Sequence, residues 1–210
     1  MIMFYGVFIV IRAGIIALSI LVCSPAFAAN PCLNENFKPI LQPPPPSNFL
    51  DVQRLHVMAG LRSESALKEI NEEADDPTPK FWIVAGVAPE SNPRLQKTIS
   101  IVQPLTAAIV LDLKSEYARM RANDVDPSLS TAIPVPWHKA YPSGHATQSF
   151  ITALAFANVF PEKTDEFMRL AAKVAINREI AGLHYTSDSD AGAVLAEQIW
   201  KAVKPTCKAK

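Results

Sequence analysis

The chain has 210 residues, of which 20 are basic and 20 acidic, so its formal net charge is zero. Hydrophobic residues make up 49% and charged residues 19%, a balance typical of a globular protein. The zero net charge gives no indication of general electrostatic binding to nucleic acid, so any affinity for anions has to come from a few cations placed together. We therefore expect one globular domain without a nucleic-acid partner.

The first 28 residues differ from the rest in composition. Their one charge, Arg12, precedes the apolar run 13–22, and the small-x-small sequence 26–28 follows. This order predicts a secretory signal peptide cleaved after Ala28, and hence a periplasmic or secreted protein. An uncleaved membrane anchor is one alternative, although Pro25 and the alanine-rich end favour a cleavage site. A lipoprotein signal acylated at Cys23 is another, which the bulky residue before that cysteine disfavours.

Two cysteines, Cys32 and Cys207, remain after the predicted cleavage, one near each end of the chain. In an oxidising compartment, two cysteines most simply form one disulfide. It would stabilise the fold by roughly 2–5 kcal/mol by closing a very long loop. The alternative is a pair of buried free thiols. The sequence has no CxxC spacing, which disfavours a metal or redox role.

Residues 29–48 contain four consecutive prolines and predict an extended arm. From Phe49 the spacing of apolar residues is helical, so we expect residues 49–207 to form one all-α domain, a single-domain helical bundle with its active site between helices. Segment 81–88 is apolar enough for a strand, but we favour a buried helix. The expected helices after the first are 63–73, 81–88, 95–122 with a kink or fresh start at Pro104, 144–159, 164–180 and 186–203. A loop, 123–141, lies among them. No apolar run after residue 28 reaches the ~18 residues that a membrane span needs.

Three segments carry candidate chemistry. In the first, Lys114 and Arg121 are seven residues apart, which on one helix would place them about 20° apart on one face. In the second, Ser143 and Gly144 read as the start of a helix, whose free amides bind oxyanions, with His145 beside them. Taken singly, these features also fit a solvated stripe of cations and an ordinary capped helix.

The third segment contains Arg178, His184 and Asp188. The histidine and the aspartate are four residues apart, so we expect both to face the same way on the last helix. A carboxylate there can accept the Nδ1 proton of the imidazole and leave Nε2 as a nucleophile. The alternative for this pair is an ordinary surface contact.

In order, the motifs Lys-x6-Arg, Pro-Ser-Gly-His and Arg-x5-His-x3-Asp resemble those of the type 2 phosphatidate phosphatase and vanadium haloperoxidase superfamily, and their spacing is similar to that of soluble bacterial class A acid phosphatases. The resemblance covers about residues 95–205. The chain departs from the family pattern twice, with Ala122 where the family has proline and Asn177 where it has serine. Neither departure removes a charged or nucleophilic group.

The resemblance implies that five groups bind the phosphate: the side chains of Lys114, Arg121 and Arg178, the hydroxyl of Ser143 and the amide of Gly144. It also implies that His184 attacks phosphorus while Asp188 orients it. His145 would protonate the leaving group and later activate water. Such a phosphatase needs no metal and no cofactor, acts on a small phosphorylated substrate and is inhibited by vanadate.

Three other functions remain open. One is a vanadium-dependent haloperoxidase, another a phosphate- or lipid-binding module without turnover, and a third a lipid phosphate phosphatase acting at a membrane surface. His56 and His138 belong to no motif and are interpreted as surface or structural residues, with His138 placed where it could line the mouth of a pocket. The oligomeric state is not predicted by the sequence.

Overall fold

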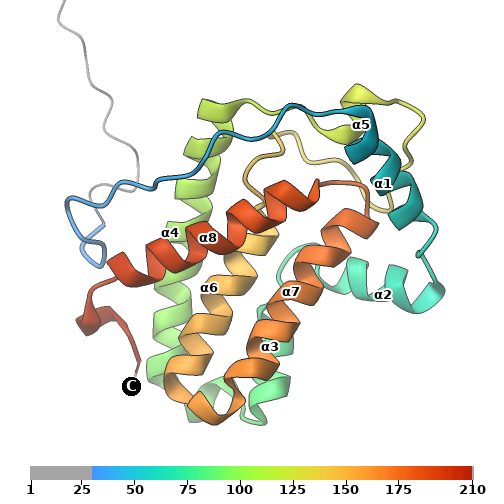
Figure 1. Ribbon diagram of the computed structural model, residues 1–210. Coiled ribbons are helices and arrows are strands. Elements are labelled where there is room, and N and C mark those ends of the chain that lie inside the picture. Colours follow the sequence, from blue (N-terminus) through green and yellow to red (C-terminus); the bar gives the residue numbers. More distant parts are fainter. Residues whose placement is uncertain (1–29, 210) are drawn as a thin grey trace, which may run out of the picture.

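The computed structural model describes residues 30–209 (Figure 1), so the predicted signal peptide lies outside the described residues. The described residues contain no β-strand, which confirms the predicted all-α class. The α-helices of this part of the chain are α1 (Phe49–Ala59), α2 (Glu64–Glu72), α3 (Thr78–Ala85), α4 (Pro93–Tyr117), α5 (Ala122–Val125), α6 (Gly144–Val159), α7 (Thr164–Ile180) and α8 (Thr186–Ala202).

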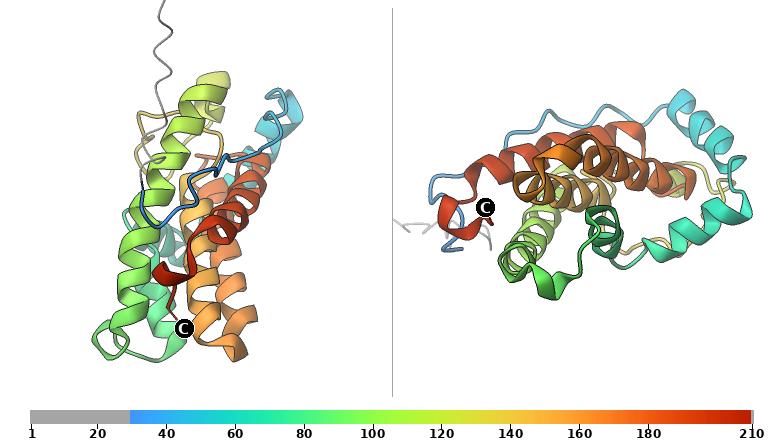
Figure 2. Two further views of the ribbon diagram at one scale, coloured as in Figure 1. Left: turned by 90° about the vertical axis from the view of Figure 1, so that its left-hand side faces the viewer. Right: turned by 90° about the horizontal axis from the view of Figure 1, so that it is seen from below.

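Helix α6 forms the centre of the bundle and packs against α4, α7 and α8 (Figure 1). Its position follows from its sequence, which contains no Asp, Glu, Lys or Arg and so can be buried on most sides. Ile151, Ala153 and Phe156 are fully buried along it. Figure 2 shows α1 and α2 lying together at one side of this bundle, away from the end where the chain terminates.

Helix α3 confirms that the apolar segment near residue 81 is helical and buried. Phe81 lies among the rings of Phe156 and Phe167, with ring centroids 5.8 and 6.5 Å away. Trp82 packs edge-on against Phe156 at 4.7 Å. The helix ends at Gly86, whose φ of 74° is the left-handed conformation that glycine adopts without strain.

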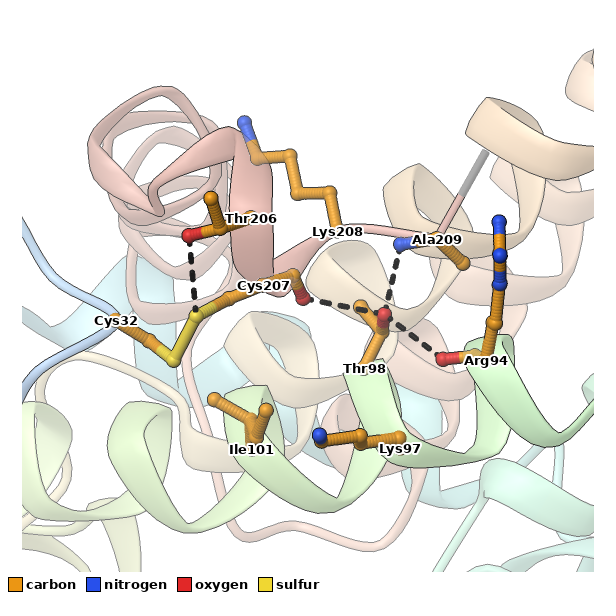
Figure 3. A pocket seen from close by; sticks show the side chains of 9 residues that line it. All are labelled: Cys32, Arg94, Lys97, Thr98, Ile101, Thr206, Cys207, Lys208 and Ala209. Carbon is orange, nitrogen blue, oxygen red and sulfur yellow. Dashed lines mark hydrogen bonds between the residues drawn. A yellow bond between two sulfur atoms is a disulfide. The ribbon is translucent and has the colours of Figure 1, made fainter.

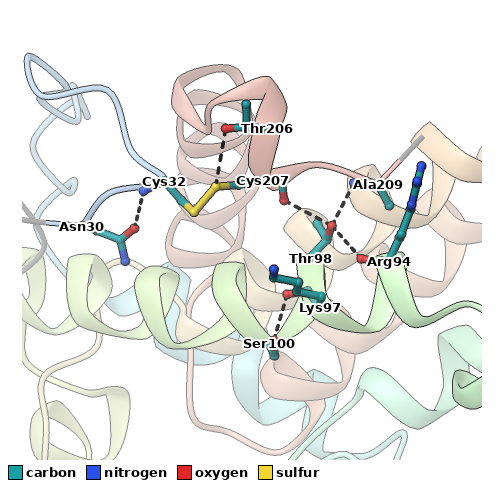
Figure 4. The surroundings of a disulfide bond; sticks show 9 residues. All are labelled: Asn30, Cys32, Arg94, Lys97, Thr98, Ser100, Thr206, Cys207 and Ala209. Atoms are coloured by element: carbon teal, nitrogen blue, oxygen red, sulfur yellow. Dashed lines mark hydrogen bonds between the residues drawn. A yellow bond between two sulfur atoms is a disulfide. The ribbon is translucent and has the colours of Figure 1, made fainter.

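The two ends of the described chain are fastened together. Cys32 and Cys207 form the predicted disulfide (Figure 4). The amide of Lys204 donates to the carbonyl of Cys32 at 2.8 Å, and Leu33 forms an isolated antiparallel bridge with Val203. From there residues 30–48 cross the molecule beside α8 to reach α1 (Figure 1), without regular secondary structure over most of their length.

One predicted helix end and one predicted residue placement are wrong. Helix α4 continues through Pro104 but ends at Tyr117, and Ala118 has a φ of 49°. Lys114 and Arg121 therefore do not share a helix. Helix α8 begins at Thr186, as expected, so the expectation that His184 lies on the last helix is wrong and His184 precedes it.

The predicted loop 123–141 also overlaps a short helix, α5. The apolar spacing that indicates helices does not mark the residue at which a helix ends, and a helix of four residues, such as α5, is too short to show that spacing. Among the described helices, none is long and apolar enough to cross a membrane.

Candidate active site

The residues of the three motifs meet at one end of the bundle, toward the top of Figure 1. There the carboxyl ends of α4 and α7 lie near the amino ends of α6 and α8, because consecutive helices run in opposite directions. Lys114 comes from the last turn of α4, His145 from the first turn of α6 and Arg178 from the last turn of α7. Residues that are up to 74 positions apart in the sequence are thereby brought together.

Close packing locks the start of α6 to the start of α8. The amide of Ser143 donates to the carbonyl of Asp188 at 2.9 Å. A Cβ at Gly192 would lie 2.8 Å from the Cβ of Ala146 and 2.9 Å from the carbonyl oxygen of Ser143, so only glycine allows this approach. The second and third motifs therefore hold a fixed relative position.

His184 is held by a buried carboxylate. Its Nδ1 lies 3.2 Å from Oδ2 of Asp188, and both side chains are almost fully buried. The other oxygen of Asp188 forms an ion pair with Nη1 of Arg119, whose guanidinium carbon also lies 4.2 Å from the centre of the Tyr185 ring. A carboxylate that accepts from Nδ1 fixes the tautomer in which Nε2 carries a lone pair.

Burial controls the protonation of this pair. Desolvation lowers the pKa of His184 to about 3, although the hydrogen bond to Asp188 opposes the shift. Desolvation alone would raise the pKa of Asp188, but the hydrogen bond from His184 and the charge of Arg119 hold it below the usual value. The pair therefore consists of a neutral imidazole and an ionised carboxylate at neutral pH.

Lys114 is buried and aimed by the loop that precedes α6. Its Nζ donates to the carbonyls of Lys139 and Ala140, both at 2.7 Å. Neutral carbonyls orient an ammonium group without cancelling its charge. Desolvation lowers the pKa of Lys114 to about 7, and the neighbouring charge of Arg121 acts in the same direction.

Arg121 immediately precedes α5, and its side chain extends into the site. Its Nη1 donates to the carbonyl of Leu183 at 2.7 Å, and its Nε donates to the carbonyl of His138 at 3.0 Å. Its Nη2 lies 3.1 Å from Nδ1 of His138. Arg121 therefore lies beside Lys114 although the two are not on one helix.

Arg178 is fully buried and contacts α2. Its Nη2 donates to the carbonyl of Ile70 at 3.0 Å and lies 3.4 Å from Oε2 of Glu73. Asn177 donates to the same carboxylate oxygen at 2.9 Å, so the residue that departs from the family pattern helps to fix Glu73. Nε and Nη1 of Arg178 have no hydrogen-bond partner among the described residues, and two unpaired buried donors of a cation are the groups that an anionic ligand would satisfy.

Ser143 caps α6, as predicted. Its hydroxyl accepts from the amide of Ala146 at 3.4 Å, and the side chain is fully buried. The next amides, of Gly144 and His145, belong to the first turn of α6 and have no carbonyl one turn earlier in the helix. Nε2 of His145 lies 3.0 Å from the carbonyl of Ala74. Desolvation and the charge of Arg178 lower the pKa of His145 to about 4.

A cavity of about 490 Å³ connects these groups to solvent. Lys114, Gly144, His145 and His184 line it, so four of the eight predicted site residues face one cavity. Arg121, Ser143, Arg178 and Asp188 lie behind them and touch or flank the lining residues. Among the described residues, no three His, Cys, Asp or Glu side chains are grouped closely enough to hold a metal ion.

Sequence reasoning missed Arg119 and Glu73, the buried partners of Asp188 and Arg178. Neither belongs to a motif, and only the fold brings them to the site. His138 lines the cavity and contacts Arg121, so it lies at the mouth of the site. His56 lies elsewhere and pairs with Asp126 at 2.9 Å, in agreement with its structural interpretation.

A second group of cations lies around a smaller cavity of about 350 Å³ beside the disulfide (Figure 3). Arg94 and Lys97 are exposed there, and Nζ of Lys208 lies 4.5 Å from the centre of the Trp200 ring. Figure 3 shows the three charged ends pointing in different directions. They do not form a convergent anion site.

Comparisons with known proteins agree with the motifs. Two curated relatives are non-specific acid phosphatases, one from Providencia stuartii, 33% identical over 27% of this chain, and one from Salmonella typhi, 40% identical over 25% of it. The aligned segments span only 23% and 21% of those relatives. A bacterial vanadium-dependent iodoperoxidase has a similar fold, with a TM-score of 0.64 at 16% identity over 82% of this chain and 52% of that one.

The family model described as the PAP2 superfamily matches residues 8–206, which include all three motifs. This match covers nearly the whole chain and agrees with the resemblance drawn from the motifs. The protein therefore belongs to the PAP2 superfamily.

Proposed function

We propose that this protein is a secreted phosphatase that hydrolyses phosphomonoesters through a phosphohistidine at His184, without a metal ion. The observation that carries the proposal is that His184, with its Nδ1 on the Asp188 carboxylate, faces the same cavity as Lys114 and His145. A nucleophile, a cation and a group that can exchange a proton are sufficient parts for phosphoryl transfer through a covalent intermediate. The sequence similarity to acid phosphatases supports the same class of reaction.

The reaction takes place in two steps. Nε2 of His184 forms a bond to phosphorus as the bond from phosphorus to the ester oxygen breaks, and His145 gives a proton to the departing oxygen. A water molecule then attacks phosphorus as the bond to Nε2 breaks, and His145 accepts the proton of that water. Asp188 holds the Nδ1 proton throughout and stabilises the charge that develops on the imidazole.

Three cations stabilise the transition state. Lys114, Arg121 and Arg178 supply positive charge to the equatorial oxygens, and the amide of Gly144 adds a donor. The two unpaired nitrogens of Arg178 give phosphate a place where it completes the hydrogen bonding of a buried group. A bound phosphate dianion also raises the pKa of His145 from about 4, since a neighbouring negative charge favours the protonated imidazole.

The test is hydrolysis of p-nitrophenyl phosphate by the purified protein. We expect turnover that is unaffected by EDTA, inhibited by vanadate, and reduced at least a thousandfold in His184→Ala. His56→Ala is the matched control, because that histidine also pairs with an aspartate but lies outside the site. An acid-labile, alkali-stable phosphoryl label should form on the wild type and not on His184→Ala. Loss of activity with EDTA that is restored by added metal would contradict the mechanism.

The same purified protein can be used to test the other candidate functions. Oxidation of halide by peroxide in the presence of vanadate would identify a haloperoxidase, and binding of phosphate without turnover would identify a binding module. A preference for phosphatidate in mixed micelles over soluble esters would identify a lipid phosphate phosphatase. Secretion is tested by sequencing the amino terminus of the exported protein, which should begin at Ala29.

A further inference from the structure

The cavity at the active site has two chemically different ends. The deep end holds Lys114 and His184, whose exposed fractions are 2% and 3%. The outer end is bounded by less buried apolar side chains from α4 and from the loop before α6, namely Ala107, Leu111, Ile133, Pro134 and Trp137. A phosphate bound at the deep end therefore directs its ester substituent into an apolar surrounding.

Trp137 is the most exposed large apolar residue in the described part of the chain, at 90%. Its ring packs edge-on against His138, with centroids 5.6 Å apart, and belongs to none of the hydrophobic core clusters of that part of the chain. Pro134 and Pro136 precede it, and proline fixes φ, so the backbone that carries the indole has little freedom to lose when a ligand binds. A pre-positioned tryptophan at the edge of a cavity is suited to stacking on a flat ligand.

The charges at the outer end restrict the ligand further. Asp75, at the turn that follows α2, is exposed and lines the cavity. Its carboxylate disfavours a substituent that carries additional negative charge. Among the other polar groups of the outer wall, Asn71 and Gln148 are uncharged amides, and desolvation lowers the pKa of His138, which favours its neutral form. Lys139 does not line this cavity but an adjacent hollow, which also contains Trp137 and His138 in its lining.

We infer that the preferred substrate is a phosphomonoester whose leaving group carries an uncharged flat ring close to the ester oxygen, and that Trp137 and Leu111 bind this ring. The inference rests on the proposed function and specifies the substrate class of the same site. Trp137 is a specificity residue in this scheme and takes no part in the chemistry. Its contribution is binding that is equal in the ground state and the transition state, so it lowers KM and leaves kcat unchanged.

The test compares benzyl phosphate with ethyl phosphate, two esters whose alcohols have similar acidity, so that the intrinsic ease of cleavage nearly cancels. We expect the wild type to prefer the benzyl ester. Trp137→Ala should reduce kcat/KM for benzyl phosphate about threefold to tenfold, mainly through KM, as a lost aromatic contact predicts. The value for ethyl phosphate should change less than twofold, and Trp137→Phe should keep most of the preference. Ile83→Ala, another strongly exposed apolar position but on α3, is the matched control.

The outcomes are distinguishable. If both esters lose the same factor in Trp137→Ala, the residue supports His138 and Arg121 and not the ring, and the inference fails while the phosphatase stands. If the wild type hydrolyses both esters equally well, the inference also fails alone. If the wild type hydrolyses neither of these esters and does not hydrolyse p-nitrophenyl phosphate, both the proposed function and the inference fail.

Discussion

Helix α4 carries cations at both ends, buried at its carboxyl end and exposed at its amino end. At its carboxyl end Lys114 is buried and held by two backbone carbonyls. At its amino end Arg94 and Lys97 are exposed beside the disulfide, and their side chains have no ion pair in the described structure. The two lysines are separated by 17 residues of helix, or roughly 25 Å.

The difference shows what turns a group of cations into an anion site. Exposed cations remain hydrated and their charged ends point in different directions, because no group of the fold offsets the repulsion between them. At the other end, the fold supplies carbonyls to Lys114 and Arg121 and a carboxylate to Arg178, which allows them to converge. Burial leaves these charges in a poorly screened environment, where they act strongly on a phosphate.

Within this comparison, the largest expected effect on activity comes from removing the buried cation of α4, and removing an exposed cation at the other end of the helix is the control. Lys114→Met should lower kcat/KM for p-nitrophenyl phosphate by about 10²–10³-fold, the usual cost of losing one group that stabilises the transition-state charge. Lys97→Met removes the same charge from the same helix and should change kcat/KM less than twofold. Circular dichroism checks that both variants keep their helices. Equal losses in the two variants would mean that only the overall charge of the protein matters.

A smaller effect concerns the pH dependence of the buried lysine. The pKa of Lys114 is lowered to about 7, so the free enzyme loses this cation as the pH rises through that value. The quantity kcat/KM reports ionisations of the free enzyme. Above pH 7, loss of the Lys114 charge should therefore lower kcat/KM by an additional factor of about ten for each pH unit. Lys114→Arg keeps a charge at all these pH values and should abolish the additional fall. The profile is measured with one substrate for both proteins, so that ionisation of the substrate cancels. A variant that retains the steep fall would show that another group causes it.

Most of the bundle could be predicted from the sequence because its helices carry strong local signals. Ser63 caps α2 and Ser143 caps α6, each by accepting from the amide three residues later. The helical reading of α3 was confirmed as well, although its apolar run also fits a strand. The disulfide followed from two cysteines remaining after the predicted cleavage.

The local geometry of the site could not be predicted in the same way. Lys114 and Arg121 were placed on one helix by their spacing, but the left-handed turn at Ala118 separates them, and no glycine marks that turn. The contact of His184 with Asp188 was predicted correctly on a wrong geometric basis, since the chain turns at Gly182 and His184 lies in the extended segment before α8 begins. Arg119 and Glu73 find their partners only through tertiary packing, which a linear pattern does not encode.

The smallest effect on activity is expected at the disulfide. Replacing both Cys32 and Cys207 with serine releases a bond that spans 175 positions in the sequence. The free energy of unfolding, measured with urea, should fall by about 2–5 kcal/mol, because the unfolded chain gains freedom. Activity below the unfolding transition should stay within twofold of the wild type, since the bond lies at the amino end of α4 and the site at the other. The hydrogen bond from Lys204 to the carbonyl of Cys32 still holds the ends in contact in the folded protein. A loss of activity without a loss of stability would show that the disulfide helps to position the active site. The two ends of α4 would then not be independent.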